Sequence, residues 1–330
     1  MKNNFDSAEK NRIWKGIKPK MKKTIKKITI VTLALALIVT MLAACGNAPA
    51  SSPEPAPAPA PAPAETPAEP EPAPAAEELS GDVIQAGSTS VQPVSQELAD
   101  AFYDLHPKVI VDVQGGGSGQ GVKAVEEDLV DFGALSRELK DEEWAAVKHD
   151  WVIAKDGIAI VVNKDVDVDD LSKEQLKGIF TGEITNWSEV GGAAAKIEVV
   201  VREEGSGTRD AFNELTGVLG KDADGNNVDN TVETALIQGS TGAIVQTVGA
   251  TEHSIGYISL GSLNDSVVAM KIEGVSPSAA TVLDGSYVVS RPFILISGRD
   301  LSPQAQAFID FIMSPAGQAI VEKSGFVPVA

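Results

Sequence analysis

Short apolar runs rich in β-branched residues alternate, along residues 80–330, with stretches whose apolar residues recur every three or four positions. Helices are expected over residues 95–105 and 302–313, the second with Pro303 in its first turn. Strands are expected over residues 83–86, 109–113, 157–163, 197–202, 255–258 and 293–296. Strand–helix alternation of this kind favours an α/β fold with mainly parallel sheets.

Loops rich in Gly, Ser and Thr follow three of these strands and open the next helical stretch. They are Gly87-Ser88-Thr89-Ser90, Gly115-Gly116-Gly117-Ser118-Gly119-Gln120-Gly121 and Gly205-Ser206-Gly207-Thr208. Free N–H groups and the positive end of a helix dipole make each junction a potential anion site. One such loop would be weak evidence, since Gly and Ser are ordinary turn and cap residues. Three of them, at strand ends where α/β sheets bind ligands, indicate a pocket for an oxyanion.

Arg202 ends the strand that precedes the third loop. The ordinary interpretation is a surface arginine, but this one stands three residues before a Gly/Ser/Thr loop that opens a helix. A guanidinium offers planar, multi-donor geometry suited to a tetrahedral oxyanion, so we expect a binding role. An acidic neighbour such as Glu204 could orient it.

The first 80 residues differ in character from the rest. Four lysines between residues 22 and 27 precede an apolar run over 28–42 and then two alanines and Cys45, the order of an export signal. Cys45 is the single cysteine, and its context Leu-Ala-Ala-Cys resembles a lipobox, which predicts a lipidated, membrane-anchored N-terminus. Met21 is a plausible translation start, which makes residues 1–20 an extension. Residues 46–80, mostly Ala, Pro and Glu, predict a disordered stalk.

Charge is unevenly distributed along the chain. Of 27 Lys and Arg and 46 Asp and Glu, residues 1–45 hold 10 and 2, which leaves 17 against 44 and a net charge of −27 for the remainder. An acidic body argues against nucleic-acid binding. It does not decide the sign of a ligand, because charges beyond about 8–10 Å are screened whereas pocket dipoles act at contact distance.

Two serines in these loops invite comparison with catalytic nucleophiles. Gln120 and Thr208 stand where Ser118 and Ser206 would need the second glycine of a G-x-S-x-G frame. None of the three histidines has a discernible link to either serine, so a serine hydrolase is disfavoured. Nucleotide binding is disfavoured as well, because neither the phosphate-loop nor the dinucleotide glycine pattern is complete.

An acidic segment matches part of a calcium-loop template. Positions 1, 3, 5, 9 and 12 are taken by Asp222, Asp224, Asn226, Asn230 and Glu233. Position 6 is Asn227 rather than glycine, and helical periodicity on either side is poor. A solvated acidic loop is therefore favoured over a calcium site, and no cofactor or other metal is expected.

In combination, these motifs resemble the phosphate-binding lipoprotein that serves as substrate-binding protein of the bacterial phosphate-specific ABC transporter. Besides the lipobox, the matching pieces are Ala86-Gly87-Ser88-Thr89-Ser90, residues 114–121, Val130-Asp131-Phe132-Gly133-Ala134-Leu135-Ser136-Arg137, Ile184-Thr185-Asn186-Trp187 and Arg202-Glu203-Glu204-Gly205-Ser206-Gly207-Thr208-Arg209. The resemblance implies a type II periplasmic-binding-protein fold, with two α/β lobes joined by crossover strands. It assigns residues 81–157 and 263–330 to lobe I and residues 158–262 to lobe II, with the anion in the cleft between them.

The resemblance also implies a set of phosphate-binding residues. These are Thr89, Ser90, Ser118 and Ser136 on one lobe, and Arg202, Ser206, Gly207 and Thr208 on the other. One branch of the family has an aspartate at the position of Ser136, where a carboxylate accepts a phosphate proton and repels sulfate. Serine donates or accepts, so we expect phosphate as the ligand with its discrimination from sulfate managed differently.

The implied function is non-enzymatic. Phosphate would close the cleft at the extracytoplasmic face, and the closed protein would deliver it to the membrane permease and ATPase subunits of an ABC transporter. Two alternatives stay open at this point. One is a binder of another tetrahedral oxyanion, such as sulfate or molybdate, and the other is a surface sensor or adhesion lipoprotein that keeps the pocket.

Overall fold

The computed structural model describes residues 78–329. The described residues all belong to one compact unit. The predicted export signal, lipidation at Cys45 and nearly all of the predicted stalk lie outside the described residues. Within residues 78–329, no helix has the length and apolar character needed to cross a membrane.

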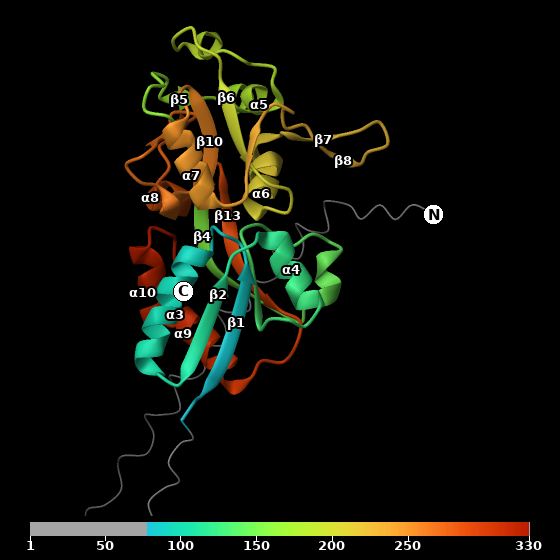
Figure 1. Cartoon of the computed structure of the whole chain (residues 1–330), viewed down its shortest axis with the longest axis vertical. Coiled ribbons are helices and arrows are strands. Elements are labelled where there is room, and N and C mark those ends of the chain that lie inside the picture. The colour runs from blue at the N-terminus through green and yellow to red at the C-terminus, as the bar shows by residue number, and fades with distance from the viewer. Residues whose placement is uncertain (1–77, 330) are drawn as a thin grey trace, which may run out of the picture. The chain divides into compact units, whose positions relative to one another are not determined.

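A nine-stranded mixed sheet runs through the whole described body (Figure 1). Its strands, in spatial order, are β2 (Val109–Gln114), β1 (Gly81–Gly87), β3 (Phe132–Leu135), β13 (Ser290–Ser297), β4 (His149–Val162), β10 (Ser254–Ser259), β6 (Glu198–Arg202) and β9 (Leu236–Gln238), with β11 (Val268–Ala269) beside β4. Pairing is parallel in the outer groups β2–β1–β3 and β10–β6–β9. It is antiparallel around β4 and β13, the strands that connect the two halves. The parallel pairing expected from sequence therefore holds within each half, and the crossover strands make the complete sheet mixed.

Helices cover both faces of the sheet in lobe I, the half that contains β1. The helices α3 (Gln92–Leu105), α9 (Pro303–Met313) and α10 (Pro315–Lys323) bury their apolar faces on one side, where Phe102, Phe308 and Val321 belong to one core. On the opposite face, α4 (Ser118–Glu126) buries Val122 and Val125 against β3 and β13. Two covered faces explain why the central strands β3 and β13 are buried along nearly their whole length, whereas the edge strand β2 alternates between buried and exposed residues.

Lobe II, the half that contains β6 and β10, has the same sandwich of helix, sheet and helix. The helices α5 (Lys173–Thr181) and α6 (Gly207–Thr216) share one core, and α7 (Thr241–Ala250) closes the other face. Successive side chains of β4 point to opposite faces of the sheet and therefore belong to different cores. Ile158 and Ile160 join the core of α5 and α6, whereas Ala159 and Val161 pack with α7.

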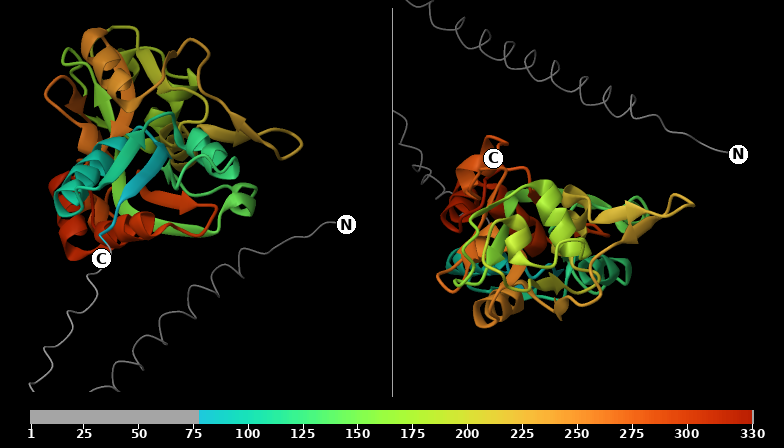
Figure 2. Two further views of the ribbon diagram at one scale, coloured as in Figure 1. Left: turned by 60° about the horizontal axis from the view of Figure 1, so that its bottom comes forward. Right: turned by 90° about the horizontal axis from the view of Figure 1, so that it is seen from above.

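Short elements complete lobe II and the loops. They are η2 (Glu143–Ala146), β5 (Asp170–Leu171), η3 (Trp187–Val190), β7 (Leu219–Lys221), β8 (Asn227–Asp229), η4 (Leu260–Ser262), β12 (Lys271–Ile272) and α8 (Ala279–Leu283). The β7–β8 hairpin extends away from the body in Figures 1 and 2. Its turn is the acidic segment that matched a calcium template. There the Asp222 carboxylate accepts hydrogen bonds from Nδ2 of Asn226 at 3.0 Å and from the backbone N–H groups of Asn226 and Asp224 at 2.8 and 2.9 Å, and these bonds, the Asn226 side chain first, lower the pKa of Asp222.

The hydrophobic core to which each residue belongs bears on where lobe II ends along the chain. Sequence assigns residues 263–330 to lobe I, but Met270, Ile272 and Val282 are buried in the core of α5 and α6. The short strand β12 also pairs with β5, which lies in lobe II. We therefore propose that the chain returns to lobe I at β13 rather than at residue 263.

The expected helices and strands are all present, and β4 exceeds its expected length by the most. Residues 157–163 were expected as a strand, whereas β4 begins at His149. Charged residues such as Lys155 and Asp156 interrupt the apolar pattern and conceal the first half of this strand. That half pairs with β13, so the concealed part forms the connection between the lobes.

A buried ion pair lies in this connection. Asp156 of β4 and Arg291 of β13 face each other across the sheet, with Nε and Nη2 at 3.1 and 2.9 Å from the carboxylate. Ser259 Oγ and the Leu260 N–H also donate to Asp156. Because burial is complete, desolvation raises the pKa of Asp156 and lowers that of Arg291. Mutual attraction thus mainly offsets lost hydration, so the intact pair adds little net stability. We propose that it instead helps to specify the register in which β4 and β13 pair.

Removal of one partner leaves the other charge buried and unpaired. We expect Asp156→Asn to lower the free energy of unfolding by about 3–5 kcal/mol, measured by urea denaturation. Asp169→Asn is the matched control, since Asp169 pairs with Lys271 at the surface and its loss is expected to leave stability near that of the wild type. Equal effects of the two substitutions would contradict this account.

Candidate functional site

The first predicted loop of lobe I meets lobe II through side-chain hydroxyls. Ser90 Oγ lies 2.9 Å from Thr208 Oγ1 and 2.9 Å from Thr241 Oγ1, and all three residues are buried. Thr89, half-buried, accepts a hydrogen bond from the Thr241 N–H at 3.2 Å. Residues about 120 and 150 positions apart in sequence are thus joined directly across the interface between the lobes.

The second loop and Ser136 lie beside this contact. Ser118, the first residue of α4, accepts the Ser136 N–H at 3.1 Å, and Ser88 donates its hydroxyl to Ser136 Oγ at 2.8 Å. Gly207 of lobe II packs directly on this group. A Cβ at residue 207 would lie 2.1 Å from Ser118 Oγ and 3.0 Å from Ser136 Oγ. Only glycine allows the α6 N-terminus to approach lobe I this closely.

We call the seven side chains Ser88, Thr89, Ser90, Ser118, Ser136, Thr208 and Thr241 the hydroxyl cluster. It contains every predicted site residue whose side chain bears a hydroxyl except Ser206. Ser206 is buried, but its hydroxyl caps α6 by accepting the Arg209 N–H at 3.4 Å. The role of Ser206 in the fold is therefore to start the helix that presents Gly207 and Thr208.

Arg202 supplies the positive charge next to the hydroxyl cluster. Its side chain is 1 % exposed, and Nη1 donates to Thr241 Oγ1 at 3.1 Å. Nε and Nη2 donate to the two carboxylate oxygens of Glu203, at 2.8 and 2.7 Å. The expectation that Glu204 orients Arg202 is wrong in this structure, because Glu204 is exposed and the adjacent Glu203 forms the bidentate pair. One edge of the guanidinium is therefore neutralised, and the other faces the hydroxyls.

The backbone of Arg202 is also fixed by neighbouring side chains. Its N–H donates to the Tyr257 hydroxyl at 3.2 Å, and its carbonyl accepts Nη1 of Arg209 at 2.7 Å. Burial raises the pKa of Tyr257, so its hydroxyl stays protonated at physiological pH. The position at which the strand β6 gives way to the loop is thereby held rigidly.

Two members of the hydroxyl cluster were not among the predicted binding residues: Ser88, which lies within the first predicted loop, and Thr241. Thr241 begins α7 after the strand β9, with Ser240 as the N-cap. The segment Gly239-Ser240-Thr241-Gly242 has the same composition as the three predicted loops and also follows a strand. The pattern was therefore present a fourth time, but β9 is only three residues long and half-exposed, which hides it.

The electrostatic character of the site follows from these elements. The helices α4, α6 and α7 begin at Ser118, Gly207 and Thr241, so three N-termini meet at the hydroxyl cluster. Each brings unpaired N–H groups and a partial positive charge. Neutral donors around one cation are suited to a small, multiply charged oxyanion.

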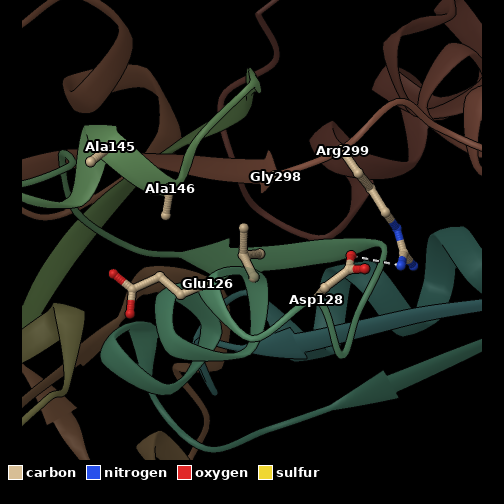
Figure 3. Close-up of a pocket in the computed structure, with 7 residues that line it drawn as sticks. Glu126, Asp128, Ala145, Ala146, Gly298 and Arg299 are labelled. Atoms are coloured by element: carbon tan, nitrogen blue, oxygen red, sulfur yellow. Dashed lines mark hydrogen bonds and ion pairs between the residues drawn. The ribbon is translucent and has the colours of Figure 1, made fainter.

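Two surface hollows lie outside the hydroxyl cluster. The first, of about 440 Å³, is lined by Val125, Glu126, Asp128, Ala145, Ala146, Gly298 and Arg299 (Figure 3). Arg299 is already paired there with Asp128 at 2.8 Å and with Asp131 at 3.0 Å, so its charge is compensated. The second, of about 510 Å³, is bordered by Gly116 and Gly119 on one side and Glu203 and Gly205 on the other, where the second and third loops meet at the surface.

The histidines among residues 78–329 contact aspartate or aromatic side chains. No three His, Cys, Asp or Glu side chains of this part of the chain gather as metal ligands would. Two histidines lie against aspartates, His149 near Asp300 and His253 near Asp165, and His106 packs on the Phe102 ring. None of them contacts a serine of the hydroxyl cluster in the part of the chain described.

A family model for the PBP superfamily domain matches residues 69–316. The phosphate-binding protein PstS of Bacillus subtilis (strain 168) is 31% identical over 308 residues, which cover 92% of this chain and 95% of that protein. The chain belongs to the PBP superfamily and, within it, to the PstS proteins.

Two solved structures are similar throughout the described body. One, from Clostridium perfringens, is described as a phosphate ABC transporter substrate-binding protein with bound phosphate. It is 42% identical, with a TM-score of 0.71, over 76% of this chain and 100% of that one. An ABC-type phosphate transport receptor from Vibrio cholerae is 35% identical, with a TM-score of 0.63, over 75% and 100%. The two-lobed periplasmic-binding-protein fold expected from the sequence is thus confirmed.

Glu203 and Glu204 allow a matched test of how Arg202 is held. Glu203→Gln leaves a buried guanidinium without its carboxylate, and we expect the free energy of unfolding to fall by about 1–3 kcal/mol. Glu204→Gln changes an exposed side chain and is expected to have little effect. Urea denaturation in buffer without multivalent anions measures both, and a larger loss for Glu204→Gln would identify Glu204 as the partner in solution.

Proposed function

We propose that this protein binds inorganic phosphate in the cleft between its lobes and delivers it to an ABC transporter. The observation that carries the proposal is the meeting of Arg202 with a hydroxyl cluster drawn from both lobes. Membership of the PstS proteins and the bound phosphate of the Clostridium perfringens structure support phosphate as the anion.

The site residues proposed for phosphate are those named from sequence, together with Thr241. Hydroxyls of Thr89, Ser90, Ser118 and Ser136 act from lobe I, and the α6 N-terminus at Ser206, Gly207 and Thr208 acts from lobe II with Arg202. Because neither lobe holds the full set, an anion gains all of its contacts only when the lobes meet. Ligand binding then shifts the population toward the closed form.

Binding without turnover is the proposed mode of action. Ser118 and Ser206 use their hydroxyls on the backbone N–H groups of Ser136 and Arg209, and neither contacts an imidazole among residues 78–329. A nucleophile needs an adjacent general base. We further propose that Cys45 is lipidated, that the body stands at the extracytoplasmic face, and that the closed form docks on the permease and ATPase assembly.

Arg202 and Thr241 test the position of the site. We expect Arg202→Ala to lose at least about 2–3 kcal/mol of phosphate binding, because a charge-assisted hydrogen bond disappears. Thr241→Val should lose about 1 kcal/mol, and Thr251→Val, at the other end of α7, should bind as the wild type does. Isothermal titration measures all three, and normal binding by Arg202→Ala would contradict the proposed site.

Ser136 tests how phosphate is separated from sulfate. A carboxylate at this position accepts the proton of hydrogen phosphate but repels sulfate, so we expect Ser136→Asp to raise the preference for phosphate at least about tenfold. Ser136→Ala, which has neither a carboxylate nor a hydroxyl in its side chain, serves as the control. Competition titrations with phosphate, sulfate and molybdate give the ratios. Wild-type protein that binds sulfate or molybdate more tightly than phosphate would instead establish a binder of another oxyanion.

A further inference from the structure

Ion pairs cross between the lobes at one carboxylate, that of Asp210. Apart from the Asp156–Arg291 pair in the crossover strands, every other ion pair among residues 78–329 stays within one lobe. Asp210 lies in the first turn of α6 in lobe II, and one of its oxygens is 2.9 Å from Arg137 Nε and 3.0 Å from Lys140 Nζ. Both cations belong to the loop that follows β3 in lobe I.

Arg137 is held in place by its own lobe. Its side chain is 5 % exposed, and its two terminal nitrogens donate to the two oxygens of Glu143, at 2.7 and 2.6 Å. Desolvation acts to lower the pKa of the Arg137 guanidinium, but the hydrogen bonds and negative charges of Glu143 and Asp210 together outweigh it and raise that pKa. The Nε–H is not aimed squarely at Asp210, so that contact is ionic rather than a well-directed hydrogen bond.

The balance of charge at this seam indicates what closure does to the group. Burial and the charge of Glu214 on α6 raise the pKa of Glu138 in the same loop, a repulsion that works against closure. Among the paired side chains, Arg137, Lys140 and Glu143 sum to one positive charge on lobe I, and Asp210 carries one negative charge on lobe II. In the closed form these charges cancel at contact distance. If the lobes separate, Glu143 still pairs with Arg137. Opening therefore leaves no buried guanidinium without a counter-charge. The pair therefore favours closure while keeping opening accessible.

The location links this group to the anion site at both ends. Arg137 directly follows Ser136, and Asp210 lies two residues after Thr208 on the same helix. On the surface seam where the second and third loops meet, the Gly119 N–H donates to the Gly205 carbonyl at 3.0 Å. The lobes are thus joined by an ionic contact and by a backbone hydrogen bond, in addition to the hydroxyl cluster.

We propose that Asp210, with Arg137 and Lys140, forms an electrostatic latch that stabilises the closed form and slows release of the bound anion. This inference rests on the proposed function. Asp210 is a positioning residue, because its carboxylate contacts cations of the other lobe rather than a proposed ligand group. The sign of its effect is diagnostic. Removing a negative charge near an anion site strengthens anion binding through simple Coulomb repulsion, whereas loss of a latch weakens it.

Asp210→Asn in the full-length protein separates these possibilities. We expect phosphate affinity to fall about fivefold to thirtyfold, mainly through faster dissociation, and the difference from wild type to shrink as salt is raised. Lys140 is half-exposed, so Lys140→Met keeps the fold and should reproduce part of the loss. The double variant should be no weaker than Asp210→Asn alone, since both substitutions remove the same contact.

Hydrogen exchange reports on closure without any ligand. In the ligand-free protein, we expect the Gly119 amide to exchange at least about threefold faster in Asp210→Asn, with the strand amides of residues 158–162 unchanged. Asp169→Asn, which removes the same charge from a pair within lobe II, should match wild type in both measurements. Wild-type exchange or undiminished affinity in Asp210→Asn would overturn the latch. If the wild-type protein binds no phosphate, the proposed function fails, and the exchange comparison alone decides on the latch.

Discussion

The site depends on keeping the Arg202 charge buried where two lobes meet. A guanidinium with 1 % exposure is unfavourable unless its donors are satisfied, and Glu203, Thr241 and the fixed backbone of the β6 end provide for this. Glu203 neutralises one edge without occupying the other. The remaining edge faces hydroxyls, which can rotate to donate or accept as a ligand requires. The position of the Arg202 guanidinium thus determines where the N-termini of α4, α6 and α7 must converge.

The crossover strands impose the second constraint. A sheet that continues through β4 and β13 means that both lobes share one hydrogen-bonded framework, so their carboxyl-end loops face each other by construction. Asp156 and Arg291, paired inside the sheet, are proposed to help specify the register of these strands. The closure proposed for phosphate binding would consequently have to bend or twist this sheet, because the connection between the lobes consists of regular strands.

Much of this arrangement follows from sequence, and the exceptions have physical causes. Apolar periodicity located the expected strands and helices, because burial on both faces leaves a clear pattern. It failed at the first half of β4, where Asp156 is charged yet buried through a partner 135 residues away. Two other misses have local causes. The advantage of Glu203 over Glu204 depends on the turn geometry, and the loop of Thr241 follows a strand too short to recognise. Pairings across long sequence separations are not encoded in any local pattern.

Gly207 shows how finely the closing distance is set. The backbone of α6 reaches the serines of lobe I because position 207 carries no side-chain carbon, and even one methyl group would lie 2.1 Å from Ser118 Oγ. The smallest possible residue therefore acts as the spacer of the cleft: any larger one holds the lobes apart by roughly the thickness of its own side chain. If phosphate binds between the lobes as proposed, the missing Cβ of Gly207 therefore also sets how large an anion the closed lobes can enclose.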